Sequence, residues 1–419
     1  MGKLYIDSDV YTEAKKRIKW AIENHPDFYV SFSGGKDSGV LFHLVREVAT
    51  ELDRLPVKVV FSDLEVVFQE TINYTKLIMD RPDVDPYWLC LEEIEDNASS
   101  VYQRYYKYWG ENEKDKWIRP LPDMDYVIHN KNIPDGLKKY YVNKSVEDWS
   151  IIYFGEYLCD IFNNPEIINF VGMRADESYG RYMNVRAMKN RDKKNMFTYK
   201  YADNKISRTN ICLPIYDWKV EDIWHYYAVN ELPYNKVYDS MFRMGISLSQ
   251  QRTCFAFGET QKNTLWQWCI IEPDTWDKMV NRVLGANFGK IYNHTNLNSM
   301  RVVKPSNITW KEYVNILLDS LPEEARNIFI DKFKIVFNYH KKMYYEKENI
   351  SPSIYIQDSK KDVKNMMKKH NLSIKYFISY ETLAGAIIKR DFVFKKYGFT
   401  NSQKMEDKIN DLYEKYKDL

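Results

Sequence analysis

The sequence predicts an α/β fold, a parallel doubly wound sheet, followed by a mainly α-helical C-terminal domain. Two observations support this. Over roughly the first 210 residues, short apolar runs alternate with helix-like stretches, and beyond residue 245 that alternation ceases. Apolar strands alternating with helices are typical of parallel sheets covered on both faces. Because 419 residues also exceed the usual size of one domain, we expect two, residues 1–245 and 246–419.

The elements of the first domain follow from their apolar residues. A first helix is expected over residues 11–23, where Ala14, Ile18 and Ile22 recur at helical spacing before Pro26. The expected strands cover residues 28–32, 57–63, 86–92 and 167–174. One expected helix starts at residue 39, and three others cover residues 66–79, 147–162 and 220–230.

The second domain has amphipathic rather than alternating segments. Helices are expected over residues 309–320, 323–345 and 407–419, and the lysine-rich residues 359–370 are expected to form a solvated helix face. No internal repeat and no long Gly/Ser linker separates the two domains. We therefore expect this half to be mainly helical and to pack against the first.

Composition narrows the class of protein. The 61 basic and 59 acidic residues nearly balance, which excludes a histone-like basic protein. No apolar run reaches the length of a membrane span, and the N-terminus lacks the apolar core of a signal peptide. The five cysteines are scattered and form no CxxC pair, and no histidine has metal-ligand spacing. These features predict a cytoplasmic protein that has no membrane-spanning helix, no disulfide framework and no structural zinc site.

The motif with the most chemical content is a loop between the first strand and its helix. It reads Ser33-Gly34-Gly35-Lys36-Asp37-Ser38. Adjacent glycines let several backbone N–H groups point inward, the following helix N-terminus adds partial positive charge, and lysine adds a full one. This arrangement suits a di- or triphosphate, although it is neither a Walker A loop nor a GxGxxG loop. The alternative is a glycine-rich structural turn.

The segment SFSGGKDSGVLFHL resembles the pyrophosphate loop, SGGxDS, of PP-loop ATP pyrophosphatases, whose fold is adenine nucleotide alpha-hydrolase-like. That superfamily includes phosphoadenylylsulfate (PAPS) reductases, the small subunit of ATP sulfurylase, GMP and NAD synthetases and tRNA-thiolating enzymes. The resemblance implies binding of ATP or a related adenine nucleotide with Mg²⁺, and cleavage between the α and β phosphates. It does not specify the reaction.

Two further segments resemble the PAPS reductase branch. Asp63 and Glu65, followed by Phe68 to Thr71, are similar to its DTxxxFPET element, and Asp63 at a strand end is expected to face the nucleotide. Gly172 to Ser178, with Arg174 and Glu177, followed by Arg181, is similar to its GxRxxESxxR signature. The two arginines would clamp phosphate or sulfate oxygens, and Glu177 would hold a guanidinium. The alternative is a surface ion-pair cluster.

The rest of the chain extends the resemblance. Residues 214–224 are similar to a PxxDWxxxDxW element of the same branch, in which Trp218 and Trp224 are expected to anchor the core. Residues 251–258, 272–292 and 379–400 resemble the uncharacterised C-terminal domain of immunoglobulin-binding regulator A-type proteins. That resemblance implies a ParB-like protein partner.

Cys254 is the only thiol within a motif. PAPS reductases use a cysteine in a C-terminal ECGLH segment, which this chain lacks, since it ends in KYKDL. Arg252 beside Cys254 is expected to lower the pKa of the thiol, as a nucleophile would require. The alternative is a buried structural cysteine.

For two segments, the sequence is compatible with either a binding role or a structural one. Residues 186–208 hold eight basic and two acidic residues, and are expected either to cover the nucleotide site, to contact nucleic-acid phosphates, or to be a solvated loop. The aromatic residues of 102–109 are expected either to stack bases or to belong to the core.

Three hypotheses follow. In the first, the chain is an enzyme that adenylylates an acceptor, with Lys36, Arg174 and Arg181 as the catalytic cations. In the second, Cys254 reduces or transfers an adenylylated sulfate. In the third, the chain is a nucleotide-sensing regulatory module that acts with a ParB-like partner or DNA.

Overall fold

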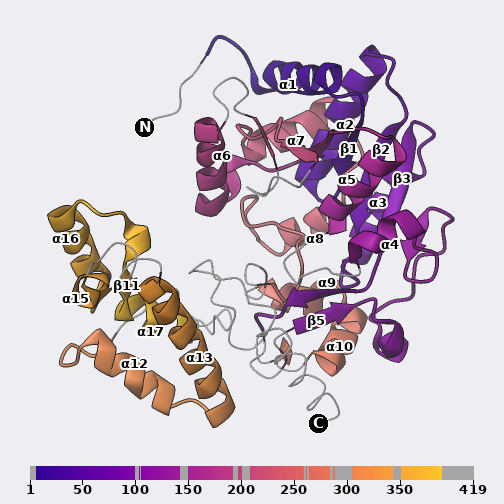
Figure 1. Cartoon of the computed structure of the whole chain (residues 1–419). Coiled ribbons are helices and arrows are strands. Elements are labelled where there is room, and N and C mark those ends of the chain that lie inside the picture. Colours follow the sequence, from indigo (N-terminus) through magenta and orange to yellow (C-terminus); the bar gives the residue numbers. More distant parts are fainter. Residues whose placement is uncertain are drawn as a thin grey trace. The chain divides into compact units, whose positions relative to one another are not determined.

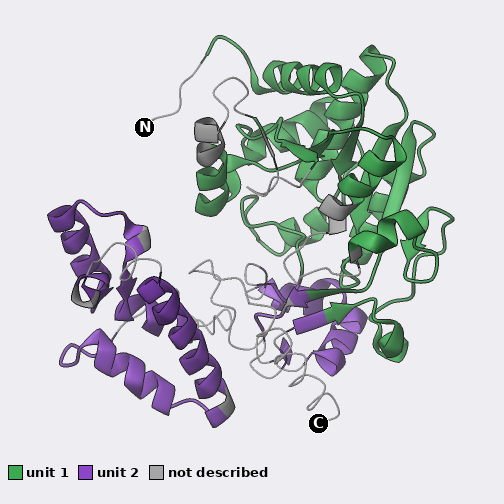
Figure 2. Cartoon of the chain, viewed as in Figure 1, with its two compact units in different colours: residues 1–94, 107–255 green, residues 95–106, 256–419 purple. Residues whose placement is uncertain are grey.

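The computed structural model describes residues 6–99, 103, 105–141, 150–191, 197–200, 208–258, 261, 264–283, 286–287, 304–342 and 351–388. The chain divides into two units, unit 1 with residues 1–94 and 107–255, and unit 2 with residues 95–106 and 256–419 (Figure 2). The sequence placed the boundary after residue 245, whereas the units divide after residue 255.

Unit 1 is built on a seven-stranded sheet of order β6-β3-β2-β1-β7-β9-β8 (Figure 1). Six strands run parallel, and β8 pairs antiparallel with β9. The strands are β1 (Phe28–Ser31), β2 (Val57–Ser62), β3 (Val84–Cys90), β6 (Val127–His129), β7 (Ile167–Val171), β8 (Thr198–Lys200) and β9 (Thr209–Cys212). The predicted parallel α/β fold is confirmed.

The helices of unit 1 connect these strands. They are α1 (Val10–Asn24), α2 (Lys36–Glu51), α3 (Gln69–Met79), α4 (Asp135–Tyr141), α5 (Ser150–Ile161), α6 (Tyr179–Arg191), α7 (Val220–Val229) and α8 (Val237–Arg243), with 3₁₀ turns η1 (Glu111–Lys116) and η2 (Ala175–Glu177). A separate ribbon pairs β4 (Glu93–Asp96) with β5 (Tyr105–Tyr108), and the division between the units falls within both strands.

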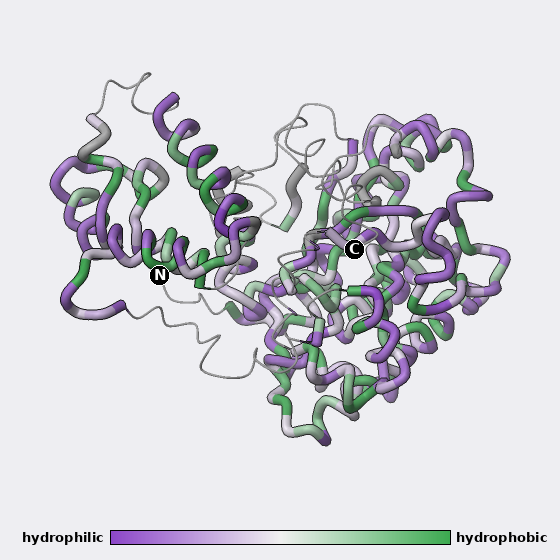
Figure 3. The backbone as a smooth tube through the Cα atoms, turned by 90° about the horizontal axis from the view of Figure 1, so that it is seen from below, coloured by the Kyte–Doolittle hydropathy of each residue, from purple (hydrophilic) through white to green (hydrophobic). Residues whose placement is uncertain are grey.

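The apolar residues of strands and helices meet in the layers beside the sheet. On one face, Phe154 and Leu158 of α5 and Leu137 of α4 pack against Tyr29 of β1 and Val60 of β2. Hydrophobic and hydrophilic residues are interspersed along the chain (Figure 3).

The strand order places the chemistry-bearing loops together. β1 has β2 on one side and β7 on the other, so the chain leaves β1 and β7 in opposite directions across the sheet. In such sheets ligands bind in the crevice at the carboxyl ends of the strands where the order reverses. The loop at 33–38 follows β1, and Gly172 and Arg174 follow β7.

His43, buried on α2, makes the stability of unit 1 depend on pH. Burial, with the nearby charges of Arg81 and Arg46, lowers its pKa from 6.5 to about 4. Between pH 6.5 and 4, His43 therefore binds a proton in the unfolded chain but stays neutral in the folded chain. The free energy of unfolding is highest above pH 6.5 and decreases as the pH falls through this range.

We expect lowering the pH from 7 to 5 to reduce the free energy of unfolding of wild type by about 2 kcal/mol more than that of His43→Leu. The measurement is urea unfolding of both proteins at the two pH values. Equal losses in the two proteins would contradict the expectation, since every other titrating group is common to both.

Unit 2 is mainly helical, as predicted. Its helices are α9 (Trp266–Ile271), α10 (Pro273–Arg282), α12 (Trp310–Asp319), α13 (Glu323–His340), α15 (Pro352–Tyr355), α16 (Lys360–His370) and α17 (Tyr380–Ile388). The short strands β10 (Ile356–Gln357) and β11 (Ile378–Ser379) pair in parallel, with a 3₁₀ turn η6 (Ile374–Tyr376) between α16 and β11. The helix expected over residues 407–419 lies outside the described residues.

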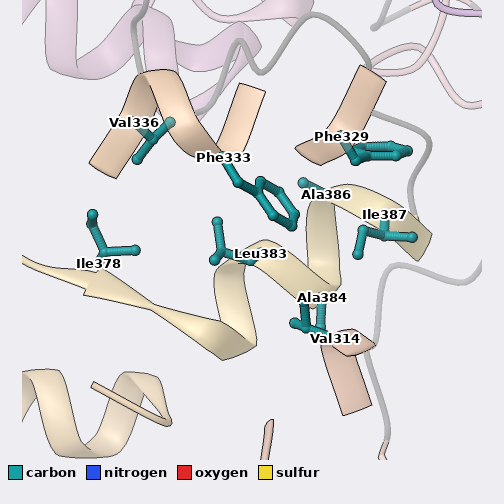
Figure 4. Packing of buried hydrophobic residues seen from close by; sticks show 9 residues of the cluster. All are labelled: Val314, Phe329, Phe333, Val336, Ile378, Leu383, Ala384, Ala386 and Ile387. Atoms are coloured by element: carbon teal, nitrogen blue, oxygen red, sulfur yellow. The ribbon is translucent and has the colours of Figure 1, made fainter. Parts of the chain in front are cut away.

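α12, α13 and α17 share a hydrophobic core (Figure 4). Val314 of α12, Phe329 and Phe333 of α13, and Leu383 and Ile387 of α17 are all buried there. On α16 only Val363 is buried and the lysines are exposed, so the expected solvated face is confirmed.

The length and apolar character of the helices bear on whether one of them could span a membrane. Within the described ranges, no helix is both long and apolar enough to cross a bilayer. α13, which has 18 residues, carries charged side chains along its length, among them Asp331, Lys332 and Lys334.

Candidate functional site

The loop between β1 and α2 needs a glycine at position 34. Gly34 has φ +67°, and a Cβ there would lie 2.5 Å from Thr71 Cγ2 and 2.8 Å from Thr75 Oγ1. Ser38 Oγ accepts the backbone N–H of Ser33 at 3.2 Å and donates to Gly35 O at 3.0 Å, which closes the loop on itself. No side chain caps α2, so the positive end of its dipole is directed at the loop.

Lys36 opens α2 and is buried, with 4% of its surface exposed. Its Nζ donates to the backbone carbonyl of Gln251 at 3.1 Å and lies 3.2 Å from Asp37 Oδ2. The ammonium also lies 5.2 Å from the centre of the Tyr238 ring. A buried ammonium with these partners has a fixed position, as a phosphate-binding cation requires.

The loop is braced by residues about 200 positions later in the chain. Asn235 Nδ2 donates to Gly34 O and Tyr227 Oη to Lys36 O, at 2.8 and 2.9 Å, and Tyr238 Oη accepts the N–H of Lys36 at 3.1 Å. None of these three supports was predicted from the sequence. One signal was available: Asn235 Oδ1 accepts the N–H of Val237 at the start of α8, as asparagine at a helix N-terminus commonly does.

The segment after β7 brings the arginines of the signature to the loop. Arg174, 3% exposed, donates from Nε to Asp37 Oδ1 at 2.6 Å. This approach depends on Gly172, since a Cβ there would lie 3.1 Å from backbone atoms of Asp37 and Ser38. Asp37 thus holds both Lys36 and Arg174 in place.

A second ion pair lies next to the first. Glu177 pairs with Arg181, as expected, and its backbone carbonyl accepts from Arg252. Burial, and then the positive charge of Arg252, lower the pKa of Arg181. Ser178 Oγ accepts the N–H of Arg181 at 3.2 Å, so this serine caps the N-terminus of α6.

Four basic side chains gather at this site. Lys36, Arg174, Arg181 and Arg252 lie here together with the carboxylates of Asp37 and Glu177. Asp176, which is half-exposed to solvent, also lies 3.9 Å from Arg174. A cationic cluster at a helix N-terminus is stabilised by a polyanion, and this is the main chemical capacity of the site.

Asp63 and Glu65, at the carboxyl end of β2, are fully buried and engaged by the protein. Asp63 Oδ2 accepts from Trp88 Nε1 at 2.7 Å and pairs with Arg119, and Oδ1 accepts the N–H of Glu65 at 2.9 Å. Glu65, at φ +63°, accepts the N–H groups of Trp109 and Ile118. Both carboxylates are held by other protein groups, and direct contact with a nucleotide stays a prediction.

Cys254 lies beside the arginines, but the predicted effect on its thiol is wrong. Burial raises the pKa of Cys254, and this outweighs the opposing effect of Arg252 and Arg181. The residue still reaches the protein surface. A thiol with a raised pKa is a poorer nucleophile at neutral pH.

We expect alkylation of Cys254 by iodoacetamide to reach half its maximal rate at a higher pH than that of an unstructured cysteine peptide. The direction follows from the raised pKa, because only the thiolate reacts. Peptide-level mass spectrometry across a pH series separates Cys254 from Cys269. A half-maximal pH below that of the peptide would restore the nucleophile hypothesis.

The site was tested for a fit to Mg²⁺. In the part of the chain that the structure describes, no group of three or more His, Cys, Asp or Glu side chains is placed to hold a metal. Asp37 and Glu177 are both paired with cations. The protein side chains therefore do not fit a dedicated Mg²⁺ site, and a magnesium ion here would depend on phosphate oxygens for its ligands.

The remaining predictions divide between core and surface. Trp218 is buried in the core, as expected, but Trp224 is only half-buried and lines a pocket, so its assignment as a core anchor is wrong. Tyr106, Tyr108 and Trp109 are buried, which confirms the core alternative, while Tyr102 and Arg104 lie outside the described residues. Most of residues 192–207 also lies outside them, so the roles expected of the basic segment stay predictions.

Two family models match the chain. Residues 27–245 match the phosphoadenosine phosphosulfate reductase domain, and residues 245–408 match a domain of unknown function (DUF3440). The second match carries no functional description, so the expected relation to immunoglobulin-binding regulator A stays a prediction.

Relatives extend over most of the chain. An uncharacterized protein of Escherichia coli (strain K12), YbdN, is 32% identical over 353 residues, which are 81% of this chain and 82% of YbdN. Among the similar solved structures is Candida glabrata FMN adenylyltransferase, with a TM-score of 0.33 and 14% identity; the match covers 56% of this chain and 62% of that one. Another is Candida auris PAPS reductase, with a TM-score of 0.28 and 12% identity; the match covers 57% of this chain and 94% of that one.

Proposed function

The chain belongs to the phosphoadenosine phosphosulfate reductase domain family, and on this basis we propose that it is an enzyme acting on ATP or a related adenine nucleotide. The nucleotide binds on the loop at 33–38, the bond between its α and β phosphates is cleaved, and AMP passes to an acceptor oxygen. The observation that supports this most is the placement of buried Lys36 and Arg174 at the uncapped N-terminus of α2, beside the loop.

The groups of the site have separate tasks in this proposal. The backbone N–H groups of the loop and the dipole of α2 hold the leaving phosphates. Lys36 and Arg174, both fixed by Asp37, neutralise the charge that develops on them. Arg181 and Arg252, both in contact with Glu177, orient the nucleotide.

The chemical step needs no covalent intermediate on the protein. The acceptor oxygen attacks the α phosphorus, the bond from that phosphorus to the bridging oxygen breaks, and pyrophosphate leaves with the electron pair. The protein contributes position and charge stabilisation, which account for most of the catalysis in transfers of this kind. The thiol-dependent alternative has less support, because the pKa of Cys254 is raised.

The test is incubation of the purified full-length protein with α-³²P-labelled ATP and Mg²⁺, followed by separation of the products. Labelled AMP, or a labelled acceptor, together with pyrophosphate would support the proposal. Labelled ADP with phosphate would contradict it, since the β–γ bond would then be the one cleaved. Intact ATP that raises the melting temperature would favour the nucleotide-sensing module, and intact ATP without a shift would contradict nucleotide binding.

A further inference from the structure

A buried arginine ties the first helix of unit 1 to the segment that follows β9. Arg17 of α1 donates from Nη1 and Nη2 to Asp217 Oδ1 and Oδ2, at 2.8 and 2.7 Å. Its Nη1 also donates to the backbone carbonyl of Pro214 at 2.7 Å, and its guanidinium carbon lies 4.5 Å from the centre of the Tyr216 ring. A bidentate ion pair has one geometry, so it fixes residues 214–217 in orientation as well as in position.

The far end of this segment is also held by α1. Trp218 is buried, and its Nε1 donates at 3.0 Å to the backbone carbonyl of Val10, the first residue of α1. The N–H of Trp218 donates to Ile215 O at 3.1 Å, which closes a turn. Residues 214–218, called here the 214–218 turn, are therefore tied to α1 at both ends.

The 214–218 turn in its turn holds the arginine that lies nearest the loop. Tyr216 O accepts the N–H of Ala175 at 2.8 Å, and Trp218 O accepts from Arg174 Nη1 at 3.5 Å. The same guanidinium donates from Nε to Asp37 Oδ1. The backbone directly after Arg174, and one end of its guanidinium, thus depend on the turn, while the other end depends on Asp37.

The residue that fixes the turn lies outside the domain that supplies the loop. α1 ends at Asn24, whereas the match to the phosphoadenosine phosphosulfate reductase domain begins at residue 27. The contacts therefore run from a helix outside the matched domain, through the 214–218 turn, to Arg174.

We propose that Arg17 and Asp217 are a positioning pair, which sets the guanidinium of Arg174 against the phosphates of the nucleotide. This inference rests on the proposed function, because it takes Arg174 as a phosphate-binding cation. A planar guanidinium binds two phosphate oxygens only in a suitable orientation, and a displacement of about 1 Å can lower a rate about 100-fold. Arg17 acts through the turn and not by contact with the nucleotide.

The test is a double-mutant cycle in the full-length protein, with Arg17→Met and Arg174→Met made alone and together. The rate of pyrophosphate release from ATP is measured under single-turnover conditions. Arg17→Met alone is expected to lower this rate about tenfold. In the Arg174→Met background it should lower the rate by less than about twofold, because the residue through which it acts is absent. Equal fold losses in the two backgrounds, or no loss in wild type, would overturn the inference.

Arg81→Met is the matched control for the loss of a bidentate ion pair. Arg81 donates from Nε and Nη2 to Asp83 at 2.9 and 3.0 Å, just before β3 begins. β1, β2 and β3 run parallel, so this pair lies at the amino ends of the strands and the loop at their carboxyl ends. Arg81→Met should lower the melting temperature and leave the rate unchanged. Arg17→Lys, which keeps the charge but not the bidentate geometry, should be slower than wild type.

A second measurement needs no nucleotide. Hydrogen exchange, followed by mass spectrometry of peptides that cover residues 172–178, reports on the Ala175 N–H that Tyr216 O accepts. Arg17→Met should accelerate exchange in these peptides, whereas Arg81→Met should not. If exchange is accelerated as expected but wild type releases no pyrophosphate, the proposed function fails and the link from Arg17 to the segment of Arg174 stands. Unchanged exchange in Arg17→Met would overturn the inference.

Discussion

Replacing Lys36 by methionine is expected to lower the rate of pyrophosphate release from ATP by about two to three orders of magnitude, the usual loss when one preorganised donor is removed from a charge-stabilising site. Methionine keeps an unbranched side chain of similar length, so the packing beside Tyr238 is preserved while the positive charge is lost. Because Lys36 is buried and held by Gln251 and Asp37, no exposed lysine can substitute for it.

The measurement is pyrophosphate release under single-turnover conditions, with the melting temperature of each protein determined alongside. Lys76→Met is the matched control, because Lys76 is exposed on α3 and the same substitution there should leave the rate unchanged. If Lys36→Met releases pyrophosphate as fast as Lys76→Met does, the loop is not the site of cleavage.

Replacing Asp63 by alanine is expected to lower the free energy of unfolding by about 3–5 kcal/mol, as when one partner of a buried ion pair is removed. Asp63 is fully buried, and its carboxylate accepts from Arg119, the Trp88 indole, the N–H of Glu65 and the Cys90 thiol. Alanine removes the carboxylate that these four groups share. The measurement is urea unfolding followed by tryptophan fluorescence.

Two comparisons make this result specific. Asp85→Ala, on the neighbouring β3, removes a partly exposed carboxylate that accepts from the Tyr87 hydroxyl, and should cost less than about 1 kcal/mol. Asp63→Asn should fall between the two, because an amide oxygen still accepts from Trp88. A loss for Asp63→Ala no larger than that for Asp85→Ala would show that the carboxylate is dispensable.

The sequence predicts those parts of the fold that depend on neighbours along the chain. α1, α2, α3 and α5 each have enough turns for apolar periodicity to be recognised, and β1, β2, β3 and β7 are rich in apolar residues. The loop at 33–38 was recognisable for the same reason, since its glycines, serines and lysine are contiguous. β6 and β8, with three residues each, are too short for a pattern to be detected, and β9, with four, was not predicted either.

The parts of the site that were missed depend on contacts between distant positions. Asn235, Tyr227 and Tyr238 reach the loop from about 200 residues away, and nothing in their local sequence indicates which backbone groups they meet. The surroundings of Cys254 could not be predicted from its neighbours in the sequence either. The adjacent Arg252 suggests a lowered thiol pKa, whereas desolvation by the surrounding protein raises it. Trp224 resembled a core residue by its type, and only its surroundings identify it as part of a pocket.

The bracing of the loop by α7 and α8 has a consequence for the order in which the site matures during translation. Every residue of the loop leaves the ribosome early, but its supports at Tyr227, Asn235, Tyr238 and Gln251 are synthesised much later. A nascent chain that ends after β9 therefore contains the whole phosphate-binding motif without the groups that shape it. The site becomes competent only once nearly all of unit 1 has emerged, so a partly synthesised chain cannot capture nucleotide prematurely.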